Sequence, residues 1–318
     1  MPGISSGSRE SRARPLRAFR PEDLTIDGLE RRTLMSAVPR SVLDSGRMIE
    51  RVNVPYTTPA GTAERLNVYS PAGQPPAGGW PVIVAIHGGG WRRLDKTGYG
   101  DRIASAFVPN GYVVVAPNYV LSAPGRPSWP RNLEDVRAAV GWVRSSAAAL
   151  RINPDQVVAM GESAGGNLAE LLGTDPGPPG PGGVSTQVQA VIAFSAPSDL
   201  PALYVQSRWA GRAAAQFLGG TPQQVPQEFA AASPIDHVAP GDPPMFLVHG
   251  REDPLVPVDQ SRMLAAALQG AGVPVQLVLV HGGHNLDFPI GAGQRNLIQP
   301  LLEFLGATWN DEGTLSIR

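Results

Sequence analysis

The sequence predicts an α/β fold with a mostly parallel, eight-stranded sheet and helices on both faces. Short apolar runs of the buried-strand type recur along the chain, and segments with the apolar spacing of helices lie between them. Polar or glycine-rich stretches follow these runs and predict loops. The chain has 318 residues, of which 42% are hydrophobic. It is therefore long enough to bury one large core within a single domain.

The first half of the chain begins with two expected antiparallel strands, since apolar and polar residues alternate there and a turn at 59–61 joins them. Continuous apolar runs and segments with helical spacing follow. The elements expected in this half are strands at 52–56, 66–69, 81–86 and 113–115, and helices at 98–108 and 132–150.

The second half continues this alternation. The elements expected there are strands at 157–160, 188–194, 245–250 and 275–280, with a helix directly after the first of them. A loop dense in Pro and Gly is expected at 174–183. An insertion at about 198–237 precedes the third of these strands, and its alanine-rich parts predict short helices that cap a pocket. Asp199 is expected at the N-terminus of the first of these helices.

The N-terminal segment, residues 1–45, differs from the rest because it is rich in Arg and Ser and poor in apolar runs. It is expected to be extended or poorly ordered, whereas 46–318 form the folded domain. No apolar run reaches the length of a membrane span, so no transmembrane segment is predicted. Neither the compartment, cytoplasmic or exported, nor the oligomeric state follows from these features.

The pentapeptide Gly161-Glu162-Ser163-Ala164-Gly165 lies between the apolar run at 157–160 and a helical stretch. A serine on such a sharp strand-to-helix turn has a strained backbone, and the flanking positions need glycine to avoid steric collision. At the start of the helix, the backbone N–H of Ala164 has no intrahelical partner and can donate to an oxyanion. The pattern predicts a nucleophile elbow with Ser163 as the nucleophile.

A second glycine-rich motif, His87-Gly88-Gly89-Gly90-Trp91, follows the apolar run at 81–86. Consecutive glycines let backbone N–H groups approach a substrate carbonyl with no Cβ in the way. Gly88 and Gly89 are therefore expected to complete an oxyanion hole with Ala164. The alternative is a glycine-rich turn without a catalytic role.

An acid and a base follow the serine along the chain. The strand at 245–250 leads to Asp253, and the strand at 275–280 leads to His284. A serine hydroxyl becomes a nucleophile when a neutral imidazole takes its proton, and a carboxylate fixes the tautomer of that imidazole. Ser163, His284 and Asp253 are predicted to fill these roles, since open α/β sheets carry their sites on loops at the carboxyl ends of strands.

Three neighbouring residues are alternatives for the base and the acid. His281 directly follows its strand, and His284 is preferred because it lies farther into the loop. Glu252 and Asp259 are rival acids. Glu252 is expected to face solvent, and Asp259 lies at a predicted helix start.

Aromatic residues near these motifs are expected to line a substrate pocket. The expected pocket residues are Trp91, His87, Tyr119 and Trp209. Trp91 adjoins the proposed oxyanion loop. The basic residues Arg92, Arg93 and Lys96 are expected to form a solvated rim, with binding of a carboxylate-bearing substrate as the alternative.

Composition argues against several other classes of function. The formal net charge of −1 argues against a nucleic-acid partner and against a strongly anionic substrate, and no basic face is evident. The chain has no cysteine, which excludes disulfides and thiolate catalysis. Its five histidines lack metal-ligand spacing, so no metal site is expected.

Taken together and in this order, the motifs resemble those of carboxylesterases of the α/β-hydrolase superfamily. The chain is similar to the hormone-sensitive-lipase-like esterases and to the bacterial feruloyl and acetylxylan esterases. The matching segments are 87–91, 118–119, 133–139, 161–166, 243–250, 253–257 and the loop of His284. The resemblance implies an α/β-hydrolase catalytic domain over 46–318 that needs no cofactor. It also implies hydrolysis of small-molecule esters with small-to-medium acyl groups through an acyl-enzyme, including feruloyl or acetyl esters of polysaccharides.

Two other functions stay open on the sequence. Acyl-enzyme chemistry also serves amide bonds, so an arylformamidase or a serine peptidase is an alternative. The fold also hosts non-catalytic binding proteins. Such proteins usually lose a member of the triad, whereas this chain has a residue for each of the three positions.

Overall fold

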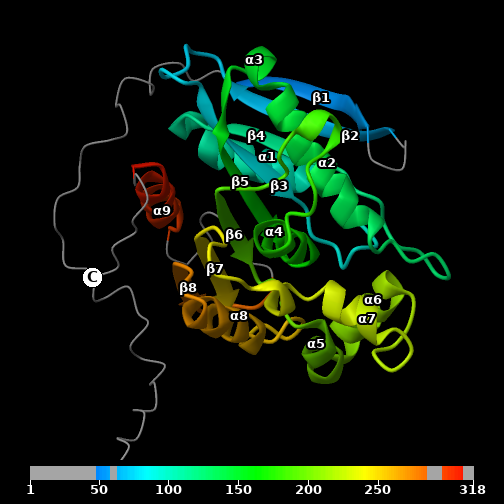
Figure 1. Cartoon of the computed structure of the whole chain (residues 1–318). Helices are drawn as coiled ribbons and strands as arrows, with labels where there is room; N and C mark the ends of the chain where they lie inside the picture. Colours follow the sequence, from blue (N-terminus) through cyan, green and yellow to red (C-terminus); the bar gives the residue numbers. More distant parts are fainter. Residues whose placement is uncertain (1–47, 58–62, 285–295, 311–318) are drawn as a thin grey trace, which may run out of the picture. The chain divides into compact units, whose positions relative to one another are not determined.

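The computed structural model describes residues 48–57, 63–284 and 296–310. Within them, one sheet has the strand order β1-β2-β4-β3-β5-β6-β7-β8 (Figure 1). The strands are β1 (Met48–Thr57), β2 (Ala63–Pro71), β3 (Trp80–Ile86), β4 (Val113–Pro117), β5 (Ile152–Glu162), β6 (Ala190–Phe194), β7 (Met245–Gly250) and β8 (Val275–Val280). The predicted extended segment 1–45 and the turn at 59–61 lie outside the described residues.

The strand pairing confirms the predicted sheet of eight mostly parallel strands. β1 pairs antiparallel with β2, and β2 pairs antiparallel with β4. From β4 to β8 every neighbouring pair is parallel. Parallel strands have their carboxyl ends at the same edge of the sheet, and the loops that carry the predicted motifs follow β3, β5, β7 and β8 at that edge.

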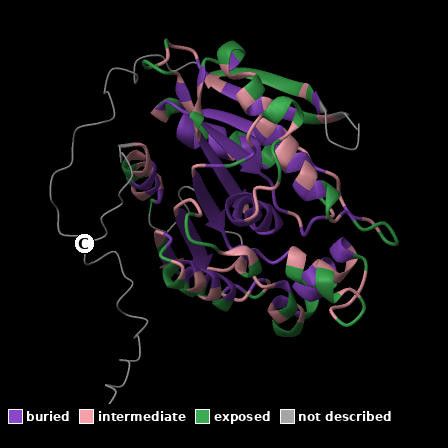
Figure 2. Cartoon of the chain, in the orientation of Figure 1, coloured by how far each residue is buried: buried purple, intermediate pink, exposed green. Residues whose placement is uncertain are grey.

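Helices cover both faces of the sheet, because side chains alternate between the two faces along each buried strand. On one face, Val84 belongs to an apolar cluster with Leu133 of α2 (Arg131–Ser145) and Leu168 of α4 (Ala164–Thr174). On the other face, Phe246 of β7 meets Phe304 of α9 (Ile298–Asn310) with ring centroids 5.4 Å apart. Figure 2 shows the central strands as the most deeply buried part of the fold.

The helices predicted at 98–108, at 132–150, after 157–160 and within the insertion are present, whereas the helix at Ile298–Asn310 was not predicted. The helices are α1 (Lys96–Phe107), α2 (Arg131–Ser145), α3 (Ala147–Leu150), α4 (Ala164–Thr174), α5 (Leu200–Gln206), α6 (Arg208–Leu218), α7 (Pro226–Ala231), α8 (Asp259–Gly270) and α9 (Ile298–Asn310), with 3-10 turns at Val108–Asn110, Pro181–Gly183 and Pro234–His237. The helix predicted over 132–150 is divided at Ser146 into α2 and α3.

The insertion between β6 and β7 contains the short helices α5, α6 and α7. The Asp199 carboxylate accepts a hydrogen bond from the backbone N–H of Ala202 at 2.8 Å and caps α5. The Ser207 hydroxyl accepts from the N–H of Ala210 at 3.2 Å and caps α6. α6 ends at Gly219 in the left-handed conformation, with φ of 91°. A capping role for this insertion over the site stays a prediction.

A buried carboxyl group connects α4 to the start of the insertion. Glu170 of α4 is fully buried, and one of its carboxyl oxygens accepts a hydrogen bond from the Ser198 hydroxyl at 2.8 Å. Its other carboxyl oxygen has no partner among the described residues. Burial raises the pKa of Glu170 to about 8, and the hydrogen bond from Ser198 lowers it only in part. Glu170 is therefore mostly protonated at neutral pH.

We expect Glu170 to make the protein less stable as the pH rises. Because the pKa is raised above its ordinary value of 4.5, the unfolded chain loses this proton first, and stability falls between about pH 4.5 and pH 8. Glu170→Gln removes this titration and should stabilise the protein above pH 8 by a few kcal/mol, on the order of 3. Urea unfolding at pH 5 and pH 8.5 measures the effect, with exposed Glu303→Gln as the control. If the free energy of unfolding changes with pH equally in wild type and in Glu170→Gln, this prediction is wrong.

Candidate active site

Ser163 lies on a strained turn between the end of β5 and the start of α4. Its φ of 56° and ψ of −120° fall where residues other than glycine are rare. A Cβ added to Gly161 would lie 2.1 Å from the carbonyl oxygen of Gly165, and one added to Gly165 would lie 2.2 Å from that of Ile86. The two glycines of the motif are thus required by the close approach of the backbone, as the sequence predicted.

His284 connects Ser163 to Asp253 through one hydrogen bond on each side of its ring. Its Nε2 lies 2.9 Å from the Oγ of Ser163, and its Nδ1 lies 2.8 Å from Oδ2 of Asp253. A carboxylate can only accept, so Nδ1 carries the proton and donates to Asp253. Nε2 is then the acceptor for the Ser163 hydroxyl. The structure therefore brings together the three side chains predicted as nucleophile, base and acid.

Asp253 is held by hydrogen bonds to both of its carboxylate oxygens. Its side chain is fully buried, and Oδ1 accepts from the backbone N–H groups of Leu255 and Val256 at 2.8 and 2.9 Å. Burial raises the pKa of Asp253, but hydrogen bonds from His249 and His284 outweigh that effect and hold the pKa well below its ordinary value. Asp253 therefore stays ionised at neutral pH.

His249 is a second histidine in contact with Asp253, and the sequence analysis did not single it out. It is fully buried at the end of β7, with Nε2 2.9 Å from the carbonyl oxygen of Val256 and 3.3 Å from Oδ2 of Asp253. Because a carbonyl can only accept, Nε2 carries the proton. Nδ1 then accepts from the Ser261 hydroxyl at 2.7 Å. The position of His249 on the strand that leads to the acid was the available signal.

We expect His249→Leu to lower kcat/KM of the reaction at Ser163 by about 10- to 100-fold, since a hydrogen bond to a charged group contributes roughly 1.5–3 kcal/mol. Without this donor the carboxylate of Asp253 is held less firmly against Nδ1 of His284, so the loss should appear in kcat of the folded variant. His249→Gln retains an amide donor and should recover part of the loss. A purely structural role would lower the melting temperature and leave kcat of the folded variant at the wild-type level.

The predicted oxyanion donors lie around Ser163. A Cβ added to Gly88 would lie 3.5 Å from the Cβ of Ser163 and 2.9 Å from the carbonyl oxygen of Glu162. Gly89 has φ of 112° and approaches the backbone of Arg93 too closely for any side chain. For the N–H groups of Gly88, Gly89 and Ala164, no acceptor occurs among the described residues. These amides are free to bind a negatively charged oxygen.

Three of the four predicted pocket residues have buried side chains and support the oxyanion loop. His87 is 1% exposed and stacks on Tyr119 at 4.3 Å, while the Tyr119 hydroxyl donates to the carbonyl oxygen of His87 at 2.8 Å. Trp91 is 2% exposed and stacks on Phe217 of α6 at 4.6 Å. A role for these three rings in lining a substrate pocket stays a prediction. Their nearness to the loop in sequence indicated that these side chains contact it, but not which way the rings face.

Trp209, the fourth predicted pocket residue, reaches the surface on α6. Its side chain lies against Gly90, where an added Cβ would be 3.6 Å from the indole ring, and the residue is 37% exposed. The guanidinium groups of Arg92 and Arg93 lie over its ring at 5.0 and 5.7 Å. Lys96 differs from the predicted rim, because it is buried and donates to the side chain of Asn53 at 2.9 Å.

The rival residues are engaged elsewhere. His281 is exposed beside Glu252, which accepts a hydrogen bond from the backbone N–H of Gly282 at 2.6 Å. Asp259 begins α8 and forms an exposed ion pair with Arg262 at 2.8 Å. None of the three contributes to the hydrogen bonds of Ser163 or His284.

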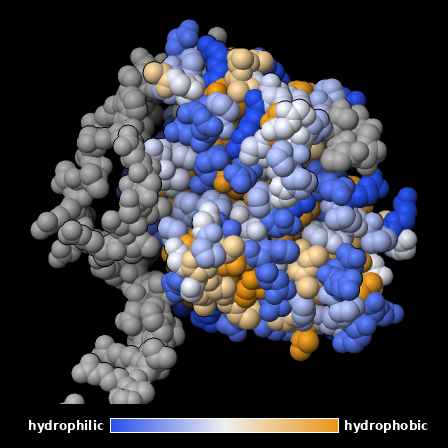
Figure 3. All heavy atoms as spheres, in the orientation of Figure 1, coloured by the Kyte–Doolittle hydropathy of each residue, from blue (hydrophilic) through white to orange (hydrophobic). Residues whose placement is uncertain are grey.

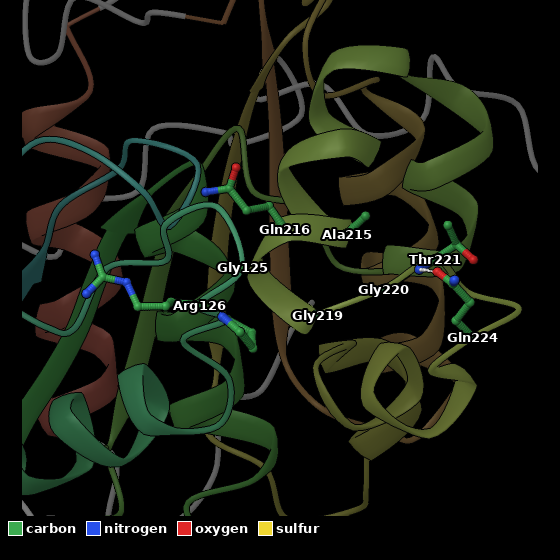
Figure 4. Close-up of a pocket in the computed structure, with 9 residues that line it drawn as sticks. Gly125, Arg126, Ala215, Gln216, Gly219, Gly220, Thr221 and Gln224 are labelled. Carbon is green, nitrogen blue, oxygen red and sulfur yellow. Dashed lines mark hydrogen bonds between the residues drawn. The ribbon is translucent and has the colours of Figure 1, made fainter.

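A hollow of about 350 Å³ lies between the 125–127 segment and the end of α6. Its lining is mostly small or polar, as Figure 4 shows. The lining residues are Gly125, Arg126, Pro127, Ala215, Gln216, Gly219, Gly220, Thr221 and Gln224. It contains none of the predicted site residues. Within the described part of the chain, no three His, Asp or Glu side chains cluster as metal ligands.

The fold and this hydrogen-bonded set define an α/β-hydrolase with a serine elbow. The chain belongs to the BD-FAE family, whose model matches residues 66–268. Esterase LipQ of Mycobacterium tuberculosis is 31% identical over 264 residues, which cover 81% of this chain and 62% of LipQ. The probable carboxylic ester hydrolase LipM of the same organism is 32% identical over 64% of this chain and 48% of its own length. The chain thus spans about half to three fifths of these curated relatives.

Solved structures agree with this assignment. Esterase 2 of Thermogutta terrifontis, phosphoramylated by tabun, is 30% identical with a TM-score of 0.66, over 85% of this chain and 97% of that chain. A truncated carbohydrate esterase from gut microbiota has a TM-score of 0.69 at 23% identity, over 83% of this chain and 97% of that chain, and supports the fold alone. No helix among the described residues is both long and apolar enough to span a membrane.

Proposed function

We propose that this protein is a serine carboxylester hydrolase. The observation that carries the proposal is the continuous chain of hydrogen bonds from Asp253 through His284 to Ser163, on a backbone turn that presents the serine beside free amide groups. The esterase names of the relatives LipQ and LipM support the same reaction class. Neither an amide hydrolase nor a non-catalytic binding protein has comparable support.

The reaction follows from the donor and acceptor roles of these groups. Ser163 Oγ attacks the ester carbonyl while its proton moves to Nε2 of His284, and the Nδ1–H of the imidazolium stays hydrogen-bonded to Asp253. The amides of Gly88, Gly89 and Ala164 bind the oxyanion of the tetrahedral intermediate. His284 then returns the proton to the leaving alkoxide, which leaves an acyl-enzyme. Water attacks the acyl-enzyme by the same route and restores Ser163.

Esters with small-to-medium acyl groups are the proposed substrates. Thermogutta terrifontis esterase 2 has structures named for bound butyrate and propionate, at 30% identity to this chain. A relative from Caldicellulosiruptor lactoaceticus, 26% identical with a TM-score of 0.60, is named an acetyl ester-xyloside bifunctional hydrolase. These names support short acyl groups, with acetyl or feruloyl esters of polysaccharides as specific cases to assay.

Covalent labelling by a fluorophosphonate probe tests the proposal, because such probes react with an activated serine. The tabun adduct of the Thermogutta relative is the precedent for organophosphorus chemistry in this family. We expect labelling of the protein at Ser163, together with hydrolysis of p-nitrophenyl acetate. Parallel assays on a phenyl ester and an N-formyl arylamine compare the ester and amide reactions. Absence of both labelling and turnover in folded protein would favour a binding protein.

A further inference from the structure

A group of four arginines and one tryptophan, exposed except for the half-buried Arg92, lies beside the oxyanion loop. We call it the Arg–Trp platform, and its members are Arg92, Arg93, Arg208, Trp209 and Arg212. Arg92 and Arg93 stack over the Trp209 ring. Arg208 and Arg212 are one helical turn apart on the exposed surface of α6, next to Trp209. The surface over α6 and α7 that Figure 3 shows is mainly hydrophilic, with separate apolar residues.

Three consecutive glycines, 88–90, lie between the platform and the nucleophile. The Trp209 ring lies against Gly90, and Gly88 lies against the Cβ of Ser163. Trp91, between Gly90 and Arg92, is fixed on Phe217 of α6. The loop that contacts Ser163 therefore also contacts the platform, so an ester bound at Ser163 can extend a second group onto the platform.

The positive charge of the platform is not neutralised within the described residues. None of its four arginines forms an ion pair there, although acidic residues in the chain, 27, slightly outnumber the 26 lysines and arginines. α6 has no acidic residue in its first turn and begins with Arg208, at the end where the helix dipole disfavours a cation. Asp95, the acid next in sequence to Arg92 and Arg93, caps α1 through the N–H of Thr97. Stability therefore does not account for this concentration of charge.

We propose that the Arg–Trp platform binds a carboxylate on the substrate, so that the preferred esters are anionic. Guanidinium groups bind carboxylates through paired hydrogen bonds, and stacking on an indole ring pre-orients their planar faces. The inference rests on the proposed ester hydrolysis and adds to it the charge class of the substrate.

Matched pairs of esters test the charge preference on each side of the scissile bond. For the alcohol side, the pair is 4-acetoxybenzoate and uncharged 4-acetoxybenzamide. For the acyl side, it is mono(4-nitrophenyl) glutarate and 4-nitrophenyl pentanoate. The readout is the ratio of kcat/KM for the anionic ester to that for its neutral partner. In wild type, at least one ratio should exceed about 10 at low salt and fall as salt screens the charges.

The double variant Arg92→Gln/Arg93→Gln should lower that ratio by about 10-fold and weaken its salt dependence. The control Arg51→Gln/Arg262→Gln removes the same charge from β1 and α8 and should keep the wild-type ratio. If the double variant keeps the wild-type ratio, the inference about the platform is overturned. Continued hydrolysis of the neutral esters would still uphold the proposed ester hydrolysis. If wild type shows neither ester hydrolysis nor fluorophosphonate labelling, both the proposed function and the platform inference are overturned. Equal melting temperatures exclude misfolding of the variants as the cause.

Discussion

Ser163→Ala is expected to lower kcat for ester hydrolysis by about 10⁴-fold or more, with the fold intact. Alanine removes the Oγ that donates a hydrogen bond to Nε2 of His284 and that is proposed to form the acyl-enzyme. The fold should persist, because the backbone N–H of residue 163 donates to Phe194 and its carbonyl accepts from Asn167, and alanine retains both bonds. Turnover of p-nitrophenyl acetate by the purified variant measures the effect.

The matched control for this variant is Ser105→Ala on α1, which also removes one hydroxyl, at an exposed position far from Ser163 in the sequence. It should keep wild-type turnover. Fluorophosphonate labelling should disappear in Ser163→Ala and persist in Ser105→Ala. Unchanged turnover in folded Ser163→Ala would reject Ser163 as the nucleophile.

Asp253→Asn is the second substitution with a large expected effect, a loss of about 10⁴-fold in kcat at neutral pH. The two backbone N–H groups at Oδ1 orient the new amide, because its oxygen must stay there as the acceptor. The NH₂ group then faces Nδ1 of His284 and can only donate to it. His284 is thereby held in the tautomer with the proton on Nε2, which cannot accept the proton of Ser163.

The same amide also faces the N–H of His249, so a hydrogen bond is replaced by a contact between two donors. We expect Asp253→Asn to be less stable than wild type by about 1–3 kcal/mol. Asp259→Asn, on the exposed rival acid, should keep both activity and stability. Activity measured on folded protein below the melting temperature separates the two effects. Activity near the wild-type level in Asp253→Asn would assign the acid to another residue.

The features that could be predicted from sequence depend on residues that are close to one another along the chain. The buried strands were recognisable as apolar runs, and all of them occur in the sheet. The elbow was recognisable because Gly161 and Gly165 leave no space for a Cβ, which is a local requirement of the turn around Ser163. The preference for His284 over His281 followed from its distance from the end of β8, and the hydrogen bond to Ser163 agrees with it.

The features that could not be predicted depend on contacts between distant segments. His249 was readable only as a strand residue, and its contact with Asp253 arises from the return of the chain at 251–256. The stacking of Trp91 on Phe217 likewise depends on α6, which lies far from Trp91 in the sequence. The orientation of the Trp91 ring is defined only when α6 and the oxyanion loop have packed against each other.

Residue types and their order along the chain were therefore sufficient for the fold class and for singling out Ser163, Asp253 and His284, which the structure places in one hydrogen-bonded set. Backbone sterics and strand-end loops are local properties. The surroundings of these residues were decided by folding: the second histidine on the acid, the buried support of the oxyanion loop and the contact of arginines with the Trp209 ring. Each of these depends on which surfaces of far-apart helices and strands meet, and a linear pattern of residues does not specify that.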